Sequence, residues 1–212
     1  MLIASYNPTH VGDTLIVLTA PDAVNQAHEA KTNITRIFDT ATGTTTGYNF
    51  LKISELLDLA GVNGSVELSD EQVAKLNAAL VAAGFEGELV ADHDPKFVVA
   101  YVESTEPHAD SDHLQVTKTQ IGEGDYLQIV SGSPNMKAGI KVVVAKVGAM
   151  MPSGLIIWPG ALRGVESNGM IVSGRELRLP NAPQVPGAMI LPDDFQAVGA
   201  AFDFEKAQGL FA

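Results

Sequence analysis

The sequence contains no cysteine, which excludes a disulfide framework and any metal site built on thiolates. No apolar run reaches the roughly 18 residues that a membrane-spanning helix needs. Residues 1–13 lack a basic segment followed by an apolar one, so we expect no secretory signal. Together these absences are typical of a protein of the reducing cytoplasm with no membrane partner.

Basic residues are scarce. Lys and Arg number 13 against 25 Asp and Glu, a net charge of −12, and affinity for phosphate comes mainly from Lys and Arg. The charge is uneven, however: residues 1–95 carry a net −9 and residues 96–212 only −3. Residues 137–178 hold six basic and two acidic side chains, a net +4. On charge alone, a binding face and scattered solubilising charge both stay open as interpretations.

The remaining composition is that of a globular protein, with 46% hydrophobic residues in 212, enough for one large or two small domains. The first half alternates short β-prone runs with helical patterns, which predicts a small α+β domain over residues 1–85. Its clearest helix is expected over 70–83, with Ser69 and Gln72 at capping-box spacing and Gly84 at the end. A shorter helix over 54–60 is also expected. The predicted strands are 1–6, 14–19, 34–39 and 45–52.

Residues 86–96 are acidic and contain Pro95, which predicts a linker between domains. The pattern then becomes purely β, with runs rich in Val, Ile and Tyr separated by glycine-rich turns. Short strands at this density predict a small closed barrel, because closure removes exposed sheet edges. The strands are expected at 97–103, 114–121, 126–130 and 140–147, once or twice between 155 and 172, and at a final edge over 188–192.

Several ordered motifs in the second half resemble one RNA-binding barrel. It is the tRNA-binding domain near the N-terminus of bacterial phenylalanyl-tRNA synthetase β subunits, which is related to stand-alone structure-specific tRNA-binding proteins. Residues 108–114 are similar to that family's His-Pro-Asn-Ala-Asp-Lys-Leu, and residues 129–135 to its Ile-Val-Cys-Gly-Ala-Pro-Asn. The chain departs from the pattern at Ala109, where the family has proline, and at His113, where it has a basic residue. The other motifs that carry the likeness are 116–118, 121–122, 141–145, 147–149, 162–170 and 173–177.

The resemblance implies an all-β OB-fold over 97–204, followed by a C-terminal tail over 205–212. It also implies a stand-alone, non-catalytic bacterial protein that binds tRNA by shape and backbone contacts and needs no cofactor. A homodimer is a further expectation, since stand-alone relatives tend to dimerise. The alternative is a protein–protein interaction module that has kept the barrel and lost RNA binding. Sparse aromatic residues, of which Trp158 is the notable one in the basic segment, favour recognition of folded RNA over stacking on single strands.

An OB barrel binds ligands across its second and third strands and the adjoining loops. Lys118 falls on the predicted second strand, and Ser167 and Met170 fall near the mouth of the barrel, where the resemblance also puts RNA contacts. Met170 could equally fill the core, and Asn135 could serve only to close a turn after Pro134. Further candidates for contacts with the RNA backbone are Asn135, Lys137, Lys146, Arg163 and Arg175.

Four potential ligands for a metal lie within six residues: His108, Asp110, Asp112 and His113. They lack the glycine and downstream glutamate of a calcium loop, so solvated or turn-capping roles are favoured and no metal site is predicted. The serines of the glycine-rich motifs have no histidine at an interpretable spacing. We therefore predict no nucleophilic catalysis and no enzyme activity.

Overall fold

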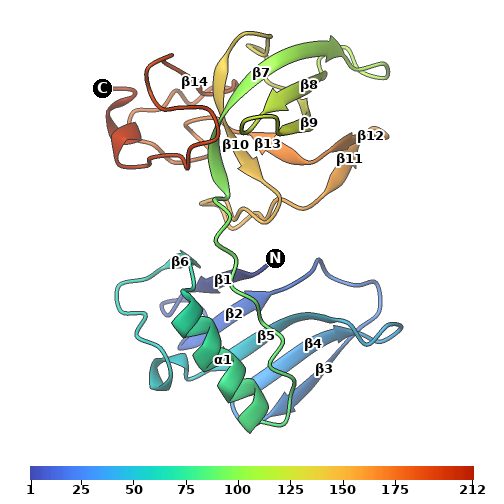
Figure 1. The fold of residues 1–212 in the computed structure, drawn as a ribbon, viewed down its shortest axis with the longest axis vertical. Helices are drawn as coiled ribbons and strands as arrows, with labels where there is room; N and C mark the ends of the chain where they lie inside the picture. Colours follow the sequence, from blue (N-terminus) through green and yellow to red (C-terminus); the bar gives the residue numbers. More distant parts are fainter. The chain divides into compact units, whose positions relative to one another are not determined.

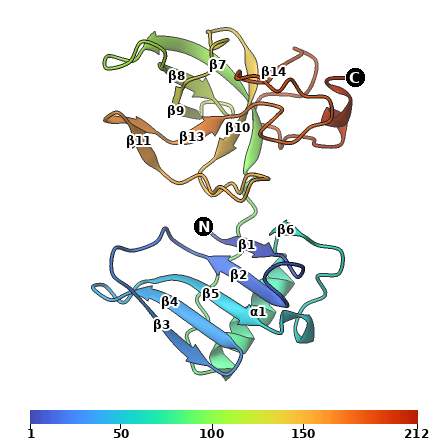
Figure 2. The same cartoon turned by 180° about the vertical axis from the view of Figure 1, so that it is seen from behind.

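The computed structural model describes residues 1–212, and the chain divides into two compact units, Met1–Asp94 and Pro95–Ala212. Figure 1 follows the chain through both units, and Figure 2 shows the same ribbon from behind. No helix in either unit combines the length and apolar character needed to cross a membrane.

The first unit, hereafter unit 1, is a six-stranded antiparallel sheet in the order β3-β4-β5-β2-β1-β6, with one α-helix packed on it (Figure 1). Tyr48 and Phe50 of β5 are buried in the same core cluster as Leu76 and Leu80 of the helix, which joins the two layers. The α+β prediction for this half is confirmed. The elements are β1 (Ile3–Tyr6), β2 (Thr14–Leu18), β3 (Gln26–Lys31), β4 (Ile34–Asp39), β5 (Thr45–Leu51), η1 (Ile53–Glu55), β6 (Gly64–Val66) and α1 (Asp70–Ala82).

Helix α1 begins at the predicted capping box. The Ser69 hydroxyl accepts from the Gln72 backbone N–H at 3.2 Å, and the Gln72 side chain accepts from the Ser69 N–H at 2.9 Å. Gly84 ends the helix with φ +80°, a conformation that glycine adopts without steric cost.

One local prediction for unit 1 was wrong, and two of its six strands, β3 and β6, were not predicted. The expected helix over 54–60 is only the single 3₁₀ turn η1, because the Ser54 hydroxyl donates to Asp13 at 2.6 Å instead of capping a helix. Strand β3 was missed because its side chains are mostly polar and exposed, as is common at a sheet edge. It pairs with β4 along its whole length, from Gln26 opposite Asp39 to Lys31 opposite Ile34.

The second unit, hereafter unit 2, is a nearly closed β-barrel of the OB type, as predicted. Its main sheet runs β13-β10-β7-β8-β9, and the Asn168 N–H donates to the Gln128 carbonyl of β9 at 2.9 Å where the sheet curls round. A separate pair, β11 and β12, forms a hairpin. The elements are β7 (Phe97–Pro107), β8 (Gln115–Gln120), β9 (Tyr126–Ser131), β10 (Lys141–Lys146), β11 (Gly160–Leu162), β12 (Val165–Ser167), β13 (Gly169–Ile171), β14 (Ile190–Leu191) and η2 (Lys206–Gly209).

Strand β10 is buried on both faces. Val142 and Val144 belong to one core cluster with Val98, Ile129 and Ile171, while the alternate residues Val143 and Ala145 belong to another. The second cluster also contains Val99 of β7 and residues from 149 onward, including Val172, Leu177, Met189, Phe195, Phe202 and Ala207. Burial on both faces explains why this strand is a continuous apolar run in the sequence.

The edges of the predicted domains differ from the structure in two places. Leu89, within the expected linker, is buried in unit 1, and its N–H and carbonyl both bond the Asn77 side chain, at 2.9 and 2.8 Å. Residues 205–212, expected to be a tail, are packed into unit 2 instead. Ala207 is fully buried, and a Cβ at Gly174 would come within 2.6 Å of the Phe211 ring.

Candidate nucleic-acid interface

Lys118 lies in the middle of β8 and points away from the barrel interior. Its neighbours Thr117 and Thr119 are buried, and the Thr117 hydroxyl donates to the Ile129 carbonyl at 2.9 Å. Since side chains alternate along a strand, burial of these two threonines leaves Lys118 on the outer face. Across the ladder it stands opposite Gln128 of β9, which is also exposed.

The Lys118 ammonium has two partners on neighbouring strands. It forms an ion pair with the Glu103 carboxylate of β7, and it lies 4.1 Å from the ring centroid of Tyr126 on β9. The hydrogen bond with Glu103 raises the pKa of Lys118, with a smaller contribution from the charge of that carboxylate. Lys118 is therefore a charged, solvent-accessible ammonium whose position is set by its two neighbours.

Ser167 is the last residue of β12, and its side chain connects the end of this strand to β9. Its hydroxyl accepts from the Val130 N–H at 3.1 Å and donates to the Gly169 carbonyl at 3.3 Å. Nearby, the Gln128 side chain donates to the Glu166 carbonyl at 2.9 Å. The structure therefore brings Lys118 and Ser167 onto one continuous surface, joined by Gln128.

Met170 lies beyond Ser167 but packs in a different direction. Its partner across the ladder is Ala145, and its half-buried side chain packs against the second core cluster rather than the face that carries Lys118. The backbone approaches closely here, because a Cβ at Gly169 would lie 3.1 Å from the Ala145 carbonyl oxygen and φ is +153°. These contacts favour a packing role for Met170.

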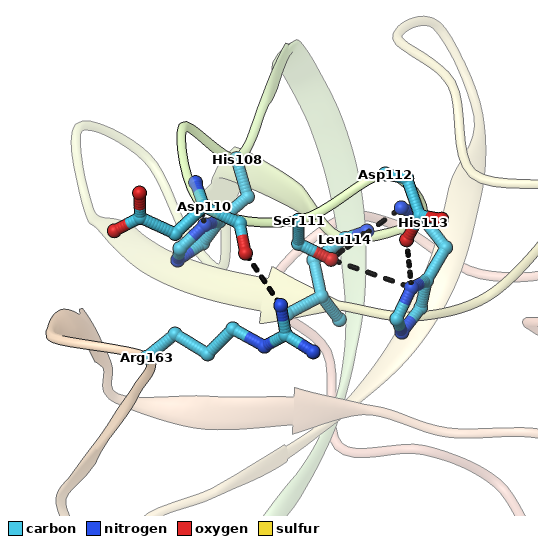
Figure 3. Close-up of polar contacts among 7 residues, drawn as sticks. All are labelled: His108, Asp110, Ser111, Asp112, His113, Leu114 and Arg163. Atoms are coloured by element: carbon cyan, nitrogen blue, oxygen red, sulfur yellow. Dashed lines mark hydrogen bonds and ion pairs between the residues drawn. The ribbon is translucent and has the colours of Figure 1, made fainter.

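The loop between β7 and β8 is attached to the β11–β12 hairpin by two hydrogen bonds, of which Figure 3 shows the one between Arg163 and Asp110. The buried His108 ring accepts from the Asp110 N–H at its Nδ1 atom, at 3.0 Å, so its Nε2–H donates to the Leu162 carbonyl at 3.1 Å. The Arg163 guanidinium donates to the Asp110 carbonyl. Arg163 is therefore exposed to solvent, but its side chain also holds the β7–β8 loop to the hairpin.

The acidic and histidine side chains of this loop form local contacts. His113 Nδ1 lies 2.8 Å from an Asp112 carboxylate oxygen, and the Ser111 hydroxyl accepts from the Leu114 N–H at 3.2 Å, which is a turn-capping arrangement (Figure 3). No group of three or more His, Asp or Glu side chains is placed to hold a metal ion.

The other predicted contacts are dispersed over unit 2. Both polar groups of the Asn135 side chain are used by the backbone of Ala188, at 2.9 and 2.8 Å, which holds the chain before β14 against the β9–β10 loop. Lys137 is exposed in that loop, and Arg175 is exposed in the turn after Ser173. Lys146 ends β10 opposite Gly169, close in the ladder to Ser167.

Three residues of the outer face were missed by the sequence reasoning: Glu103, Tyr126 and Gln128. The last two could have been found, because inward Leu127 and Ile129 alternate with them along β9. Glu103 could not, since its position depends on a bulge in β7 between Val102 and Ser104. Together with Lys118 these side chains place a cation, an aromatic ring, an amide and a carboxylate on the outer face of the barrel, and such groups can bind a ligand through non-covalent contacts.

The fold and this surface define an OB-type barrel joined to a separate α+β unit, and comparisons with known proteins agree. Residues 97–199 match a family model described as "Putative tRNA binding domain", and residues 21–92 match one described as "Domain of unknown function (DUF4479)". The chain is 47% identical over 202 residues to the "Putative tRNA-binding protein YtpR" of Bacillus subtilis (strain 168), which covers 95% of this chain and 99% of that protein. The chain belongs to the same family as this Bacillus protein.

Unit 2 also resembles part of a much larger enzyme subunit. The phenylalanine–tRNA ligase β subunit of Neisseria meningitidis (strain Z2491) is 45% identical over 131 residues, and that of Oceanobacillus iheyensis is 43% identical over 128. These matches cover 60% and 57% of this chain but only 16% of either subunit. Among solved structures, the C-terminal domain of Plasmodium vivax p43 is 26% identical with a TM-score of 0.35, covering 55% of this chain and 68% of that one.

Proposed function

We propose that this protein binds folded tRNA without catalysing a reaction, through the outer face of β7, β8 and β9 and the adjoining loop after β12. The observation that carries the proposal is the arrangement of Lys118, Gln128 and Ser167 on one surface, within the segment that matches a tRNA-binding family model. Lys118 supplies a charge for a phosphate, while Gln128 and the loop after β12 supply polar groups for sugars and base edges.

Shape rather than sequence is the proposed basis of recognition. The face carries one exposed ammonium, which is too little for a phosphate-driven site, and its two exposed tyrosines, Tyr101 and Tyr126, are too few for a row of stacked bases. A surface with few charges gains most from an RNA whose groups are already fixed in space, because less conformational entropy is lost on binding. Folded tRNA meets that requirement and unstructured RNA does not.

The finer parts of the proposal concern the remaining residues, the location and the assembly state. Lys137, Lys146, Arg163 and Arg175 would add contacts with the RNA backbone from other parts of unit 2, whereas Asn135 and Met170 would act mainly by holding the surrounding protein backbone. We place the activity in the cytoplasm, where bacterial tRNA is found. A homodimer is the assembly expected from stand-alone relatives, and light scattering at binding concentrations would test it: a monomeric mass would remove that part of the proposal.

The proposed function is tested by comparing labelled tRNA with an RNA duplex and an unstructured RNA of equal length, at low salt. Binding to tRNA should be the tightest of the three. Equal affinity for all three would contradict recognition of shape, and no binding to any would favour a protein-interaction role for the barrel. Aminoacylation is outside the proposal, because the chain spans only 16% of the ligase subunits that it matches.

A further inference from the structure

The exposed ammonium of the candidate interface is not free in the unbound protein. Glu103, Lys118 and Tyr126 form a closed cluster, hereafter the Lys118 triad, on the outer face of β7, β8 and β9. The carboxylate of Glu103 pairs with the Lys118 ammonium, the ammonium lies over the Tyr126 ring at 4.1 Å, and the Tyr126 hydroxyl is 3.5 Å from Glu103. All three side chains remain in contact with solvent, so a ligand can reach them.

The backbone of β7 directs the carboxylate to this position. The register with β8 shifts between Val102, which stands opposite Thr119, and Ser104, which stands opposite Lys118. Glu103 is therefore the extra residue of a β-bulge, and it and Ser104 are both exposed in succession, which breaks the usual alternation. Bulges re-aim side chains, and this one sets an acidic group beside the central cation of the face.

A phosphate that binds Lys118 competes with this carboxylate for the ammonium. It must either displace Glu103 from the ammonium or share the ammonium with it, and in both cases two negative charges come close together. An unstructured RNA carries donor groups too, but none is held in place, so ordering one beside the carboxylate costs conformational entropy. A folded RNA can hold a 2′-hydroxyl or a base amino group beside the phosphate, and such a donor can bond the displaced carboxylate.

We propose that Glu103 is a specificity-determining residue, which competes with phosphate for Lys118 and thereby weakens binding of RNA that has no fixed donor to offer in return. This inference rests on the proposed function of the outer face. Glu103 would thus act on selectivity in two ways. It would lower the affinity for unstructured RNA by competing with phosphate, and it would accept a hydrogen bond from a donor of the folded RNA.

The test substitution is Glu103→Gln, which keeps the shape and the capacity to accept from Tyr126 but removes the charge. We expect the affinity for unstructured RNA to rise by about two- to fivefold, the range of an exposed ion pair. The affinity for tRNA should rise by less, so that the ratio of the two affinities falls. Both are measured on the full chain at the same low salt concentration.

Removing any acidic residue from a protein of net charge −12 reduces repulsion of RNA, so a matched control is needed. Glu106→Gln serves, because Glu106 is exposed on the same strand, stands opposite Val116 rather than a cation, and loses the same charge. A second control repeats Glu103→Gln in a Lys118→Ala background. If Glu103 acts through Lys118, its effect should disappear there.

The inference is supported if Glu103→Gln reduces the preference for tRNA, Glu106→Gln does not, and the effect requires Lys118. It is overturned if the two glutamine variants behave alike, if the effect persists without Lys118, or if Glu103→Gln leaves the preference unchanged or strengthens it. The RNA preference of the unsubstituted protein distinguishes failure of the proposed function from failure of this inference. A parent that does not prefer tRNA contradicts the proposed function and this inference together, whereas a parent that does, with no specific effect of Glu103, contradicts the inference alone.

Discussion

The Ser167 hydroxyl accepts the backbone N–H of Val130 at 3.1 Å, and this bond joins the loop after β12 to strand β9. Val130 is buried, so its N–H has few other partners to turn to. In β12 itself, the Glu166 carbonyl accepts from the Gln128 side chain on the outer face. The shape of the candidate interface therefore depends on a hydroxyl that the sequence alone would suggest as a direct RNA contact.

Replacing Ser167 by alanine should lower both stability and binding. The Val130 N–H loses its acceptor, which should reduce the free energy of unfolding by about 1–2 kcal/mol, as for other buried groups left without a partner. The tRNA affinity should fall while the slope of log affinity against log salt stays the same, since no charge is lost. Denaturant titrations and binding at several salt concentrations measure both effects. Ser167→Thr, which keeps the hydroxyl, is the control, and a change in salt slope for Ser167→Ala would argue against the structural role.

Replacing Lys118 by alanine should change the salt dependence itself. Each phosphate contact that is lost reduces the slope by about 0.7 to 0.9, so the variant should bind tRNA more weakly at low salt and with a flatter dependence. Lys75→Ala is a matched control, because Lys75 is also exposed and also paired with a carboxylate, Glu71 at 2.8 Å, but lies on α1 of unit 1. An equal loss of slope for the two variants would mean that Lys118 makes no specific contact.

The acidic unit 1 should oppose RNA binding by long-range repulsion. Residues 1–95 carry a net −9, so a fragment that begins at Pro95 should bind tRNA more tightly than the full chain at low salt. The difference should shrink as salt is raised, because charges are screened beyond about 10 Å at 0.1 M. Fluorescence anisotropy of labelled tRNA over a salt series measures it. Weaker binding by a folded fragment at every salt concentration would show instead that unit 1 supplies contacts.

The stability of unit 1 should fall at alkaline pH. Burial, followed by the hydrogen bond to Glu88, raises the pKa of Tyr48 from 10.0 to about 12. A raised pKa stabilises the folded state fully below the unfolded value and progressively less as pH rises from about 10 to about 12. The loss attributable to Tyr48 should be about 2 kcal/mol by pH 12, measured by denaturant unfolding. In Tyr48→Phe this component should be absent, and an unchanged alkaline loss would assign it to other groups such as Tyr6, whose pKa is also raised.

Where local chemistry decides the structure, the sequence was a good guide. The capping box at Ser69 and Gln72 fixes the start of α1, and the alternation of buried and exposed residues in β8 puts Lys118 outside the barrel. Contacts between residues far apart in the chain could not be predicted from the sequence. Ser54 bonds a residue 41 positions away rather than capping a helix, and Asn135 bonds a backbone 53 positions away. The bulge that sets Glu103 against Lys118 has no local signal either, because it follows from how β7 is shared between β8 and β10.

The central claim, recognition of a folded RNA surface, is tested most directly by changing the tRNA rather than the protein. Affinity for the full chain is measured for one tRNA, for the same tRNA with an altered anticodon, and for a version whose base changes prevent its tertiary fold while keeping its length. We predict equal affinity for the first two and a sharp loss for the third, because the proposed face offers few groups that read base sequence. Equal affinity for all three, or a loss that follows the anticodon, would contradict the account.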